Sequence, residues 1–513
     1  MSAPQVFTTL TADELLREAE ADEWAWISSS VYECGRVVSD APWLDGHAER
    51  LRFVLTEQAG DGGWGLPGFR LVTSLSATEA LLTAYHRWAA VDRVVPRAEL
   101  RRAAASALVS LRRTLAEATG PLPDLVAIEL LVPRLVEVIN ERLRRLAEEG
   151  DSFGDEPLRV PAHTLSSALA QLRGATAAGR PVPPKLWYSW EIVGSGRPQD
   201  PAVAPVAGSV GCSPAATVAW LGARPPAGHR SLRYLDAVQR RTGGLFPIGA
   251  PMPHFERSWI LNLFHTHGVP HQASPAMLDG LEAALGPDGA PGGDGLPVDA
   301  DDTAAVLYAL DAHGRDPDVT ILLRYFDGDK FFTYPEERTS SPTTNAHALD
   351  ALGHWTSRRP AQSRKYAPVL HKTRDWLIGA QNADGSWADK WHGSPFYATA
   401  TCVQALAGYG GSAARPAVER AVAWVLDQRQ GDRWGLGGGT VEETAYAAWI
   451  LHLSAASERP ELVDSLAAAR RGIREGIADR PPAMWFAKDV YAPVRIIRAT
   501  CLAVAHRLRR TRS

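Results

Sequence analysis

The spacing of apolar residues predicts helices along almost the whole chain. From Ala12 to Ile27, Leu15, Leu16 and Ala19 share one face of a helix, and Thr11 is a suitable N-cap. From Gly208 onward the apolar segments become shorter and more evenly spaced, with Gly, Pro and Asp between them. Almost nothing alternates with the period of two that a half-buried strand requires. The pattern therefore predicts an all-α protein.

A short motif recurs between predicted helices and consists of Gln, a Gly-containing turn and Trp. It occurs as Gln58–Trp64, Gln381–Trp387 and Gln428–Trp434, and the last two tryptophans are 47 residues apart. That distance is the size of a helix-pair repeat. We expect each Gln to hydrogen-bond a neighbouring helix while the Trp packs over it. Helix hairpins repeated in this way suggest closed α/α-barrels that surround a cavity.

Three aspartates, Asp299, Asp301 and Asp302, directly precede an apolar helical segment. A helix N-terminus favours carboxylates, so one interpretation is a simple N-cap with acidic neighbours. Three carboxyl groups this close cannot all ionise cheaply, and we expect one to be held protonated by its neighbours. A neutral carboxylic acid in a dry cavity is a Brønsted acid suited to a weak base.

Two further acids, Asp124 and Glu129, lie at the start of another apolar helix. An ionised Glu129 would be costly there unless it is paired. The pair is either a helix cap with an acid that reaches the helix edge, or two oxygen ligands for Mg²⁺.

Composition narrows the class of protein. With 513 residues, two or three domains are expected. The net charge is −4 and the basic residues are dispersed, which argues against nucleic acid as a partner. The four cysteines are far apart, so neither a disulfide framework nor a zinc site is indicated. No apolar run is long enough to span a bilayer and no signal pattern opens the chain, so we expect a cytoplasmic protein without stable membrane insertion.

The Asp299-Ala300-Asp301-Asp302 motif, in a helical chain with Gln…Trp repeats, resembles the class II terpene cyclases, specifically the bacterial diterpene cyclases of the copalyl diphosphate synthase type. Weaker matching segments cover almost the whole chain: 61–65, 75–80, 211–217, 255–259, 389–397, 442–446 and 488–493. The resemblance implies two α/α-barrel domains called β and γ with the active site between them. Residues 1–35 would be the first helix of β, 36–207 the inserted γ domain, and 208–513 the rest of β.

The reaction implied by the resemblance is protonation-initiated bicyclisation of a linear isoprenyl diphosphate. The motifs that ionise a diphosphate in class I enzymes are absent from the sequence, so the diphosphate would be retained. Asp301 would donate the proton, while Asp299 and Asp302 would orient it and stabilise the remaining carboxylate. Asn345 resembles an Asn that hydrogen-bonds the donor in related cyclases; a helix cap after Pro342 is the alternative.

Binding roles follow from the same resemblance. Asp124 and Glu129 match a pattern that looks like a Mg²⁺ site in bacterial relatives, although the longer acidic stretch of the plant members is missing here. Lys390 and Lys488 would contact the diphosphate, or are surface lysines. Aromatic faces stabilise carbocations, and the candidates, each of which could instead be core, are Trp259, Phe246, Trp391, Phe396 and Tyr397.

Several alternatives remain open at this point. The substrate is expected to be C20 geranylgeranyl diphosphate, giving a copalyl (labdane-type) diphosphate, but C15 farnesyl diphosphate would give drimenyl diphosphate if Phe246 and Phe396 shorten the pocket. A class I synthase or a phosphatase would then use the product. An α/α-toroid glycosidase needs two separated carboxylates, which this motif fits poorly. A noncatalytic helical-repeat binding protein would tolerate Asp301→Asn.

Overall fold

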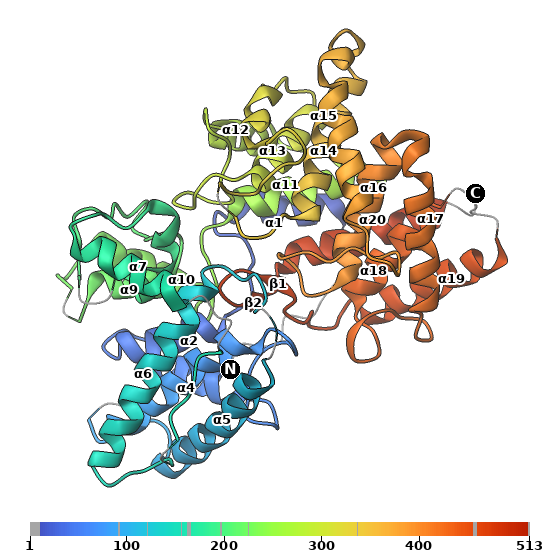
Figure 1. Cartoon of the computed structure of the whole chain (residues 1–513). Coiled ribbons are helices and arrows are strands. Elements are labelled where there is room, and N and C mark those ends of the chain that lie inside the picture. Colours follow the sequence, from blue (N-terminus) through green and yellow to red (C-terminus); the bar gives the residue numbers. More distant parts are fainter. Residues whose placement is uncertain are drawn as a thin grey trace.

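The chain folds almost entirely into helices in the computed structural model (Figure 1). The structure describes residues 11–90, 93–118, 120, 122–154, 156–161, 166–194, 197–223, 225–335, 337–454 and 459–510. Residues 1–10 of the segment predicted as 1–35 lie outside this part. Within it, two-residue strands β1 (Trp485–Phe486) and β2 (Val490–Tyr491) form an antiparallel pair. The predicted all-α class is confirmed.

The helices follow one another as α1 (Ala12–Ala21), α2 (Val31–Asp40), α3 (His47–Thr56), α4 (Arg70–His86), α5 (Arg97–Glu117), α6 (Ile128–Glu148), α7 (Ser166–Ala177), α8 (Trp190–Val193), α9 (Pro214–Leu221), α10 (Arg230–Arg241), α11 (Pro253–His267), α12 (Pro275–Ala284), α13 (Ala300–Ala312), α14 (Pro342–Ser357), α15 (Pro360–Gly379), α16 (Pro395–Tyr409), α17 (Gly411–Asp427), α18 (Val441–His452), α19 (Pro460–Gly476) and α20 (Val494–Arg510). Short 3₁₀ helices cover Pro184–Ser189, Val319–Tyr325 and Leu436–Gly438.

The larger barrel has an inner ring in which each helix packs against the next. The ring runs α11, α13, α14, α16, α18 and α20, and α20 returns to α11. The helices α12, α15, α17 and α19 lie outside it, and α1 packs across α11 and α20 from the far end of the sequence. Thr11 caps α1 as predicted, because its hydroxyl accepts from the N–H of Glu14 at 3.3 Å. The N-terminal helix thus completes the outer layer of this barrel.

The smaller barrel closes later in the sequence than predicted. Its inner ring runs α2, α4, α6, α8 and α9, with α9 packed on α2. The same apolar core includes Trp220, Leu235 and Phe246. A ring that ended at residue 207 would lack α9, which follows the Pro-rich stretch and fills the gap between α8 and α2. The core therefore continues past the predicted boundary between residues 207 and 208.

The Gln…Trp turns connect neighbouring helices. The Gln58 amide donates to a carbonyl of α5 at 3.0 Å, and the Trp64 indole donates to a carbonyl of α3 at 2.7 Å. Gln381 and Trp387 make the equivalent bonds to α17 and α15 at 2.9 and 2.8 Å. In the third copy the Trp434 indole bonds a carbonyl of α17 at 2.7 Å. The role predicted for the Gln is confirmed in the first two copies.

Lys488 joins the two barrels. It lies in the turn between β1 and β2, is completely buried, and its Nζ lies 2.7 Å from Glu33 Oε1 and 2.9 Å from Glu191 Oε1. It also donates to the Ser213 hydroxyl at 2.9 Å. A buried ammonium group with two carboxylate partners is not available to a diphosphate. This placement contradicts the substrate contact predicted for Lys488 and makes it part of the interface between the barrels.

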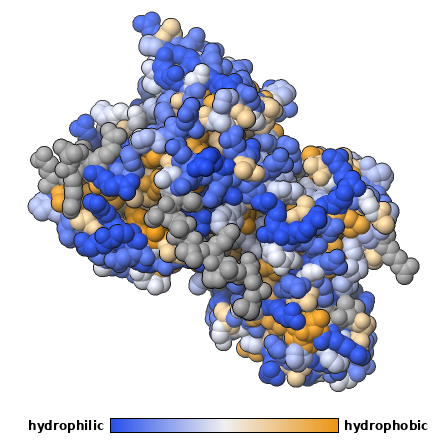
Figure 2. Space-filling view, turned by 180° about the vertical axis from the view of Figure 1, so that it is seen from behind, coloured by the Kyte–Doolittle hydropathy of each residue, from blue (hydrophilic) through white to orange (hydrophobic). Residues whose placement is uncertain are grey.

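Helix length and surface character bear on membrane insertion. Among the residues that the structure describes, no helix is both long and apolar enough to cross a bilayer. On the face in Figure 2, hydrophilic residues surround separate small apolar patches.

We expect Lys488→Met to lower the melting temperature markedly, because Glu33 and Glu191 would stay buried without their cation. Removing one partner of a buried ion pair costs about 3–5 kcal/mol. Differential scanning fluorimetry tests this, with Lys372→Met as the control because that exposed lysine lies 3.8 Å from its nearest carboxylate. Equal melting of the two variants would contradict the structural role of Lys488.

Candidate active site

A cavity of about 310 Å³ lies between the two barrels. The smaller barrel supplies Leu125, Ala127 and Tyr188 to its wall, while the larger barrel supplies Trp259 and Asp301. The wall contains the three aspartates, ionic side chains from both barrels, and aromatic and aliphatic groups. The cavity is large enough for a small ligand.

The three aspartates are positioned by the start of α13. Asp299 is the N-cap, and its carboxylate accepts from the N–H of Asp302 at 2.7 Å. The other oxygen of Asp299 accepts from the Tyr334 hydroxyl at 2.9 Å. Asp301 and Asp302 occupy the first turn, where free N–H groups favour carboxyl groups. The local preference for acids at a helix start therefore brings all three to the cavity wall.

Burial keeps protons on this triad. Burial raises the pKa of Asp299 to about 7, and the nearby charge of Asp301 adds to this effect. Burial also raises the pKa of Asp302 well above its usual value, with Asp299 and Asp301 contributing as neighbouring negative charges. The predicted crowding of carboxyl groups is thus present, and part of the triad is protonated near neutral pH.

His347 is the hydrogen-bond partner of Asp301. Its Nδ1 lies 2.7 Å from Asp301 Oδ1. Burial alone lowers the pKa of His347, but the charge of Asp301 and this hydrogen bond outweigh burial and raise it above the usual value. An N–H donated by His347 stabilises the carboxylate that remains when Asp301 gives a proton away.

Asn345 does not make the contact predicted for it. Its amide oxygen accepts from the Phe331 N–H at 2.8 Å, and its amide nitrogen donates to the carbonyls of Phe331 and Ser341 at 2.8 and 2.9 Å. Ser341 caps α14 and fixes its phase, so that Asn345 faces this loop while His347, two residues later, faces Asp301. The predicted bond to the acid is therefore made by His347.

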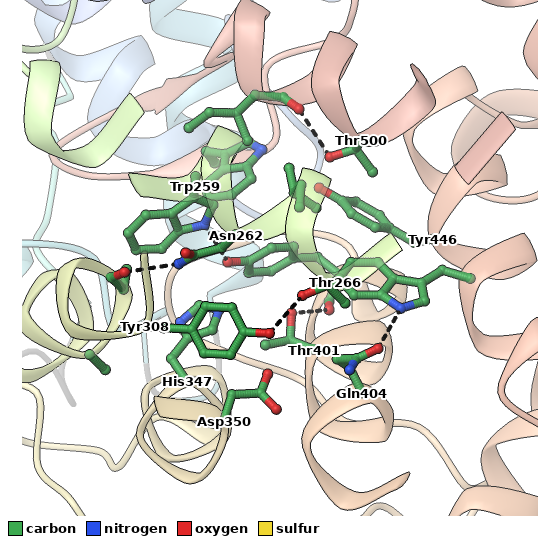
Figure 3. Close-up of a pocket in the computed structure, with 17 residues that line it drawn as sticks. Trp259, Asn262, Thr266, Tyr308, His347, Asp350, Thr401, Gln404, Tyr446 and Thr500 are labelled. Atoms are coloured by element: carbon green, nitrogen blue, oxygen red, sulfur yellow. Dashed lines mark hydrogen bonds between the residues drawn. The ribbon is translucent and has the colours of Figure 1, made fainter. Parts of the chain in front are cut away.

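A second, smaller cavity of about 60 Å³ lies inside the larger barrel (Figure 3). It shares Trp259, Tyr397 and Trp485 with the first cavity, and His347 also lines it. Asp350 faces it, and burial raises the pKa of that carboxyl to about 7. One oxygen of Asp350 has no hydrogen-bond partner among the described residues.

Aromatic rings cover much of the main cavity. Of the predicted residues, Trp259, Trp391 and Tyr397 line it. The sequence analysis missed Phe255, Trp485 and Tyr491, which line it as well. The ring centroids of Phe255 and Trp259 are 4.7 Å apart, and those of Tyr397 and Trp485 are 4.6 Å apart. Aromatic abundance was the available signal, but it does not separate wall residues from core residues.

Two of the aromatic residues that were predicted to contact the substrate lie in the cores of the barrels. Phe246 is fully buried in the smaller barrel, beneath the guanidinium of Arg50 at 5.2 Å. Phe396 packs against Trp424 with ring centroids 4.6 Å apart. Neither residue lines the main cavity. Their predicted contact with substrate is contradicted, and so is the argument that they shorten the pocket.

The mouth of the cavity carries acids and bases from both barrels. Asp124 and Glu129 line it, together with Arg338 and Lys390. Arg338 Nε donates to Asp124 Oδ1 at 2.8 Å, and Lys390 Nζ donates to Glu337 Oε2 at 2.7 Å. Lys390 therefore lines the cavity but already has an anionic partner, and its contact with a diphosphate stays a prediction.

The two acids at the mouth, Asp124 and Glu129, suit Mg²⁺ chemically. Mg²⁺ takes one or two carboxylates and completes its shell with waters and phosphate oxygens. Within the described ranges, no three His, Cys, Asp or Glu side chains are grouped to hold a metal by themselves. The donor set therefore fits an ion that shares its ligands with a phosphorylated molecule.

Known proteins resemble this chain over nearly its full length. Residues 338–478 match the family described as squalene-hopene cyclase C-terminal domain. The chain is 39% identical over 503 residues to the ent-copalyl diphosphate synthase of Streptomyces sp. (strain KO-3988), covering 96% of this chain and 94% of that protein. It is 38% identical over 517 residues to the copalyl diphosphate synthase of Streptomyces cyslabdanicus, covering 98% and 96%.

A solved structure agrees with this similarity. The ent-copalyl diphosphate synthase from Streptomyces platensis superposes with a TM-score of 0.89 at 42% identity, covering 96% of this chain and 98% of that one. The chain belongs to the class II terpene cyclases, in the family of the bacterial copalyl diphosphate synthases. The predicted family and enzyme class are confirmed, and the glycosidase and binding-protein alternatives are set aside.

We expect Asn345→Ala to lower the melting temperature, because it leaves the buried N–H and carbonyl of Phe331 without the partners that Asn345 provides. Each unpaired buried group costs about 1–3 kcal/mol. Asn382→Ala is the control, since Asn382 is exposed and its amide nitrogen bonds only the Ser386 hydroxyl among the described side chains. If Asn345→Ala melts like the wild type, its role in holding the Phe331 loop is contradicted.

Proposed function

We propose that the protein converts geranylgeranyl diphosphate into a copalyl-type bicyclic diphosphate and retains the diphosphate group. The observation that carries this proposal is Asp301, a hydrogen-bonded carboxyl group at the wall of an aromatic cavity. The full-length similarity to copalyl diphosphate synthases supports the same reaction.

Asp301 starts the reaction as a general acid, in the form of the triad in which it carries one of the protons shared with Asp299 and Asp302. Its O–H bond breaks, a C–H bond forms at the terminal alkene, and a tertiary carbocation results. The N–H of His347 stabilises the carboxylate left on Asp301. Asp299 is held by Tyr334 and by the N–H of Asp302, so it keeps the acid in place at the start of α13.

The positive charge then moves along the hydrocarbon chain of the substrate. The next alkene attacks it and closes the first ring, a further alkene closes the second, and the final cation loses a proton. The overall reaction is an isomerisation. The faces of Trp259, Trp485 and Tyr491 offer electron density without a strong base, and each cation–π contact contributes about 0.5–2 kcal/mol. An apolar wall also excludes the water that would trap the cation.

The charged mouth is the proposed place of the diphosphate. Arg338 and Lys390 supply donors there. Asp124 and Glu129 would hold Mg²⁺, which supplies charge neutralisation for the diphosphate when bound. With the head group at the mouth, the hydrocarbon extends past the aromatic walls toward Asp301.

The C20 substrate is favoured over C15 farnesyl diphosphate. The relatives reported above carry copalyl names, and Phe246 and Phe396, which had suggested a shorter pocket, lie outside the cavity wall. The product keeps its diphosphate, so a class I synthase or a phosphatase is the kind of enzyme that would use it next.

Incubation with Mg²⁺ and geranylgeranyl diphosphate should give a bicyclic alcohol after phosphatase treatment, detected by mass spectrometry. Asp301→Asn should reduce the rate by at least about 10²–10⁴-fold, the usual contribution of a general acid. Asp318→Asn is the control, because Asp318 is an exposed cap of a 3₁₀ helix. Cyclisation of only farnesyl diphosphate would overturn the chain length, and cyclisation of neither diphosphate would overturn the function.

The rate should fall as the pH rises through about 7, because Asp299 ionises there and the triad then holds one proton fewer for the donor. The Tyr334 hydroxyl stabilises ionised Asp299. Tyr334→Phe should therefore raise the pKa of Asp299 and move the falling limb of the kcat profile to higher pH. Tyr366→Phe, which removes a hydroxyl outside the cavity wall, should leave the profile unchanged. A shift to lower pH in Tyr334→Phe would contradict this assignment.

A further inference from the structure

Arg338 connects the two barrels at the cavity mouth. It lies in the segment before α14, and two of its nitrogens donate to Asp124 Oδ1, the one from Nε at 2.8 Å. The Thr339 hydroxyl donates to the other oxygen of Asp124. A third nitrogen of Arg338 lies 4.0 Å from Glu129 Oε2. One guanidinium thus pairs with Asp124 and lies near Glu129, the two carboxylates that suit Mg²⁺.

Arg338 differs in exposure and in hydrogen bonding from Lys390, the other cation described above at the mouth. Lys390 has a nearly buried side chain and donates to Glu337 at 2.7 Å and to the Thr339 carbonyl at 2.6 Å. The Arg338 side chain is 36% exposed, and that of Asp124 is 18% exposed. A planar guanidinium can bind a phosphate through two parallel hydrogen bonds, whereas an ammonium acts as a point charge.

We infer that Arg338 pairs with Asp124 only in the free protein, and that it binds the diphosphate of the substrate instead when the substrate arrives. This inference rests on the proposed function. In the free protein Arg338 pairs with Asp124 and offsets part of the negative charge of Asp124 and Glu129. When the diphosphate enters the mouth, Arg338 binds it, and the two carboxylates become available as oxygen ligands for Mg²⁺.

Because of this exchange, the binding of Mg²⁺ and the binding of diphosphate depend on each other. Mg²⁺ alone has to displace Arg338 from Asp124 and leave that cation without an anion nearby. The diphosphate removes this penalty because it gives Arg338 a new partner. Mg²⁺ and diphosphate should therefore bind with positive coupling, and by linkage each strengthens the other by the same factor. Coupling factors between two sites are typically about 5–150-fold.

Isothermal titration calorimetry of the full chain tests this with Mg²⁺ alone, inorganic pyrophosphate alone, and both together, corrected for the magnesium pyrophosphate complex in solution. In Arg338→Ala, Mg²⁺ alone should bind at least about fivefold tighter, pyrophosphate should bind weaker, and the coupling should fall toward one. Asp124→Asn should show the opposite pair of changes, with weaker Mg²⁺ and tighter pyrophosphate.

Two further variants control this experiment. Arg338→Lys keeps the charge without the paired donors, so it should recover part of the coupling. Arg324→Ala removes an exposed arginine that pairs with Asp288 at 3.0 Å outside the cavity wall, and it should change nothing.

A purely structural Arg338 predicts a different result. If Arg338 only held the barrels together, Arg338→Ala and Asp124→Asn would both weaken the binding of Mg²⁺ and of pyrophosphate. This outcome would overturn the exchange, and so would unchanged coupling. Wild-type protein that cyclises its substrate while Arg338→Ala keeps the coupling would refute the exchange alone. Wild-type protein that cyclises neither diphosphate refutes the proposed function, whatever the binding data show.

Discussion

Three carboxyl groups held within four residues at the start of α13 cannot all carry a charge in a buried wall. Because of this constraint, Asp299 and Asp302 keep protons that free aspartates lose below neutrality. The helix start provides the N–H groups that tolerate this crowding, and His347 reaches Asp301 from the neighbouring inner helix. The crowding thus keeps protons in the triad, and His347 stabilises the carboxylate that is left when Asp301 gives its proton away.

The cavity beside this acid depends on the contact between the barrels. The wall combines residues of both barrels, so it exists only while they are held together. The turn between β1 and β2 inserts Lys488 between Glu33 and Glu191, while its flanking residues Trp485 and Tyr491 face the cavity. One short hairpin therefore fixes the interface and supplies part of the aromatic wall.

Local patterns made the fold and the acid predictable, because helix periodicity, the Gln58 turn and the position of Asp301 all depend on residues close in sequence. The remaining site depends on the phase of helices and on packing between distant segments. Asn345 and His347 are two positions apart, and only the observed start of α14 decides which of them faces the acid. Lys488 resembles a surface lysine in sequence, since its partners are hundreds of residues away.

In the proposed function the diphosphate stays attached, and the charges at the mouth agree with this. Loss of a diphosphate from carbon requires concentrated positive charge to stabilise the leaving anion. Here Arg338 faces Asp124 and Lys390 faces Glu337, so these cations are matched by carboxylates in the described part of the mouth. The carbocation is thus formed at the buried acid at the start of α13, by protonation of the alkene.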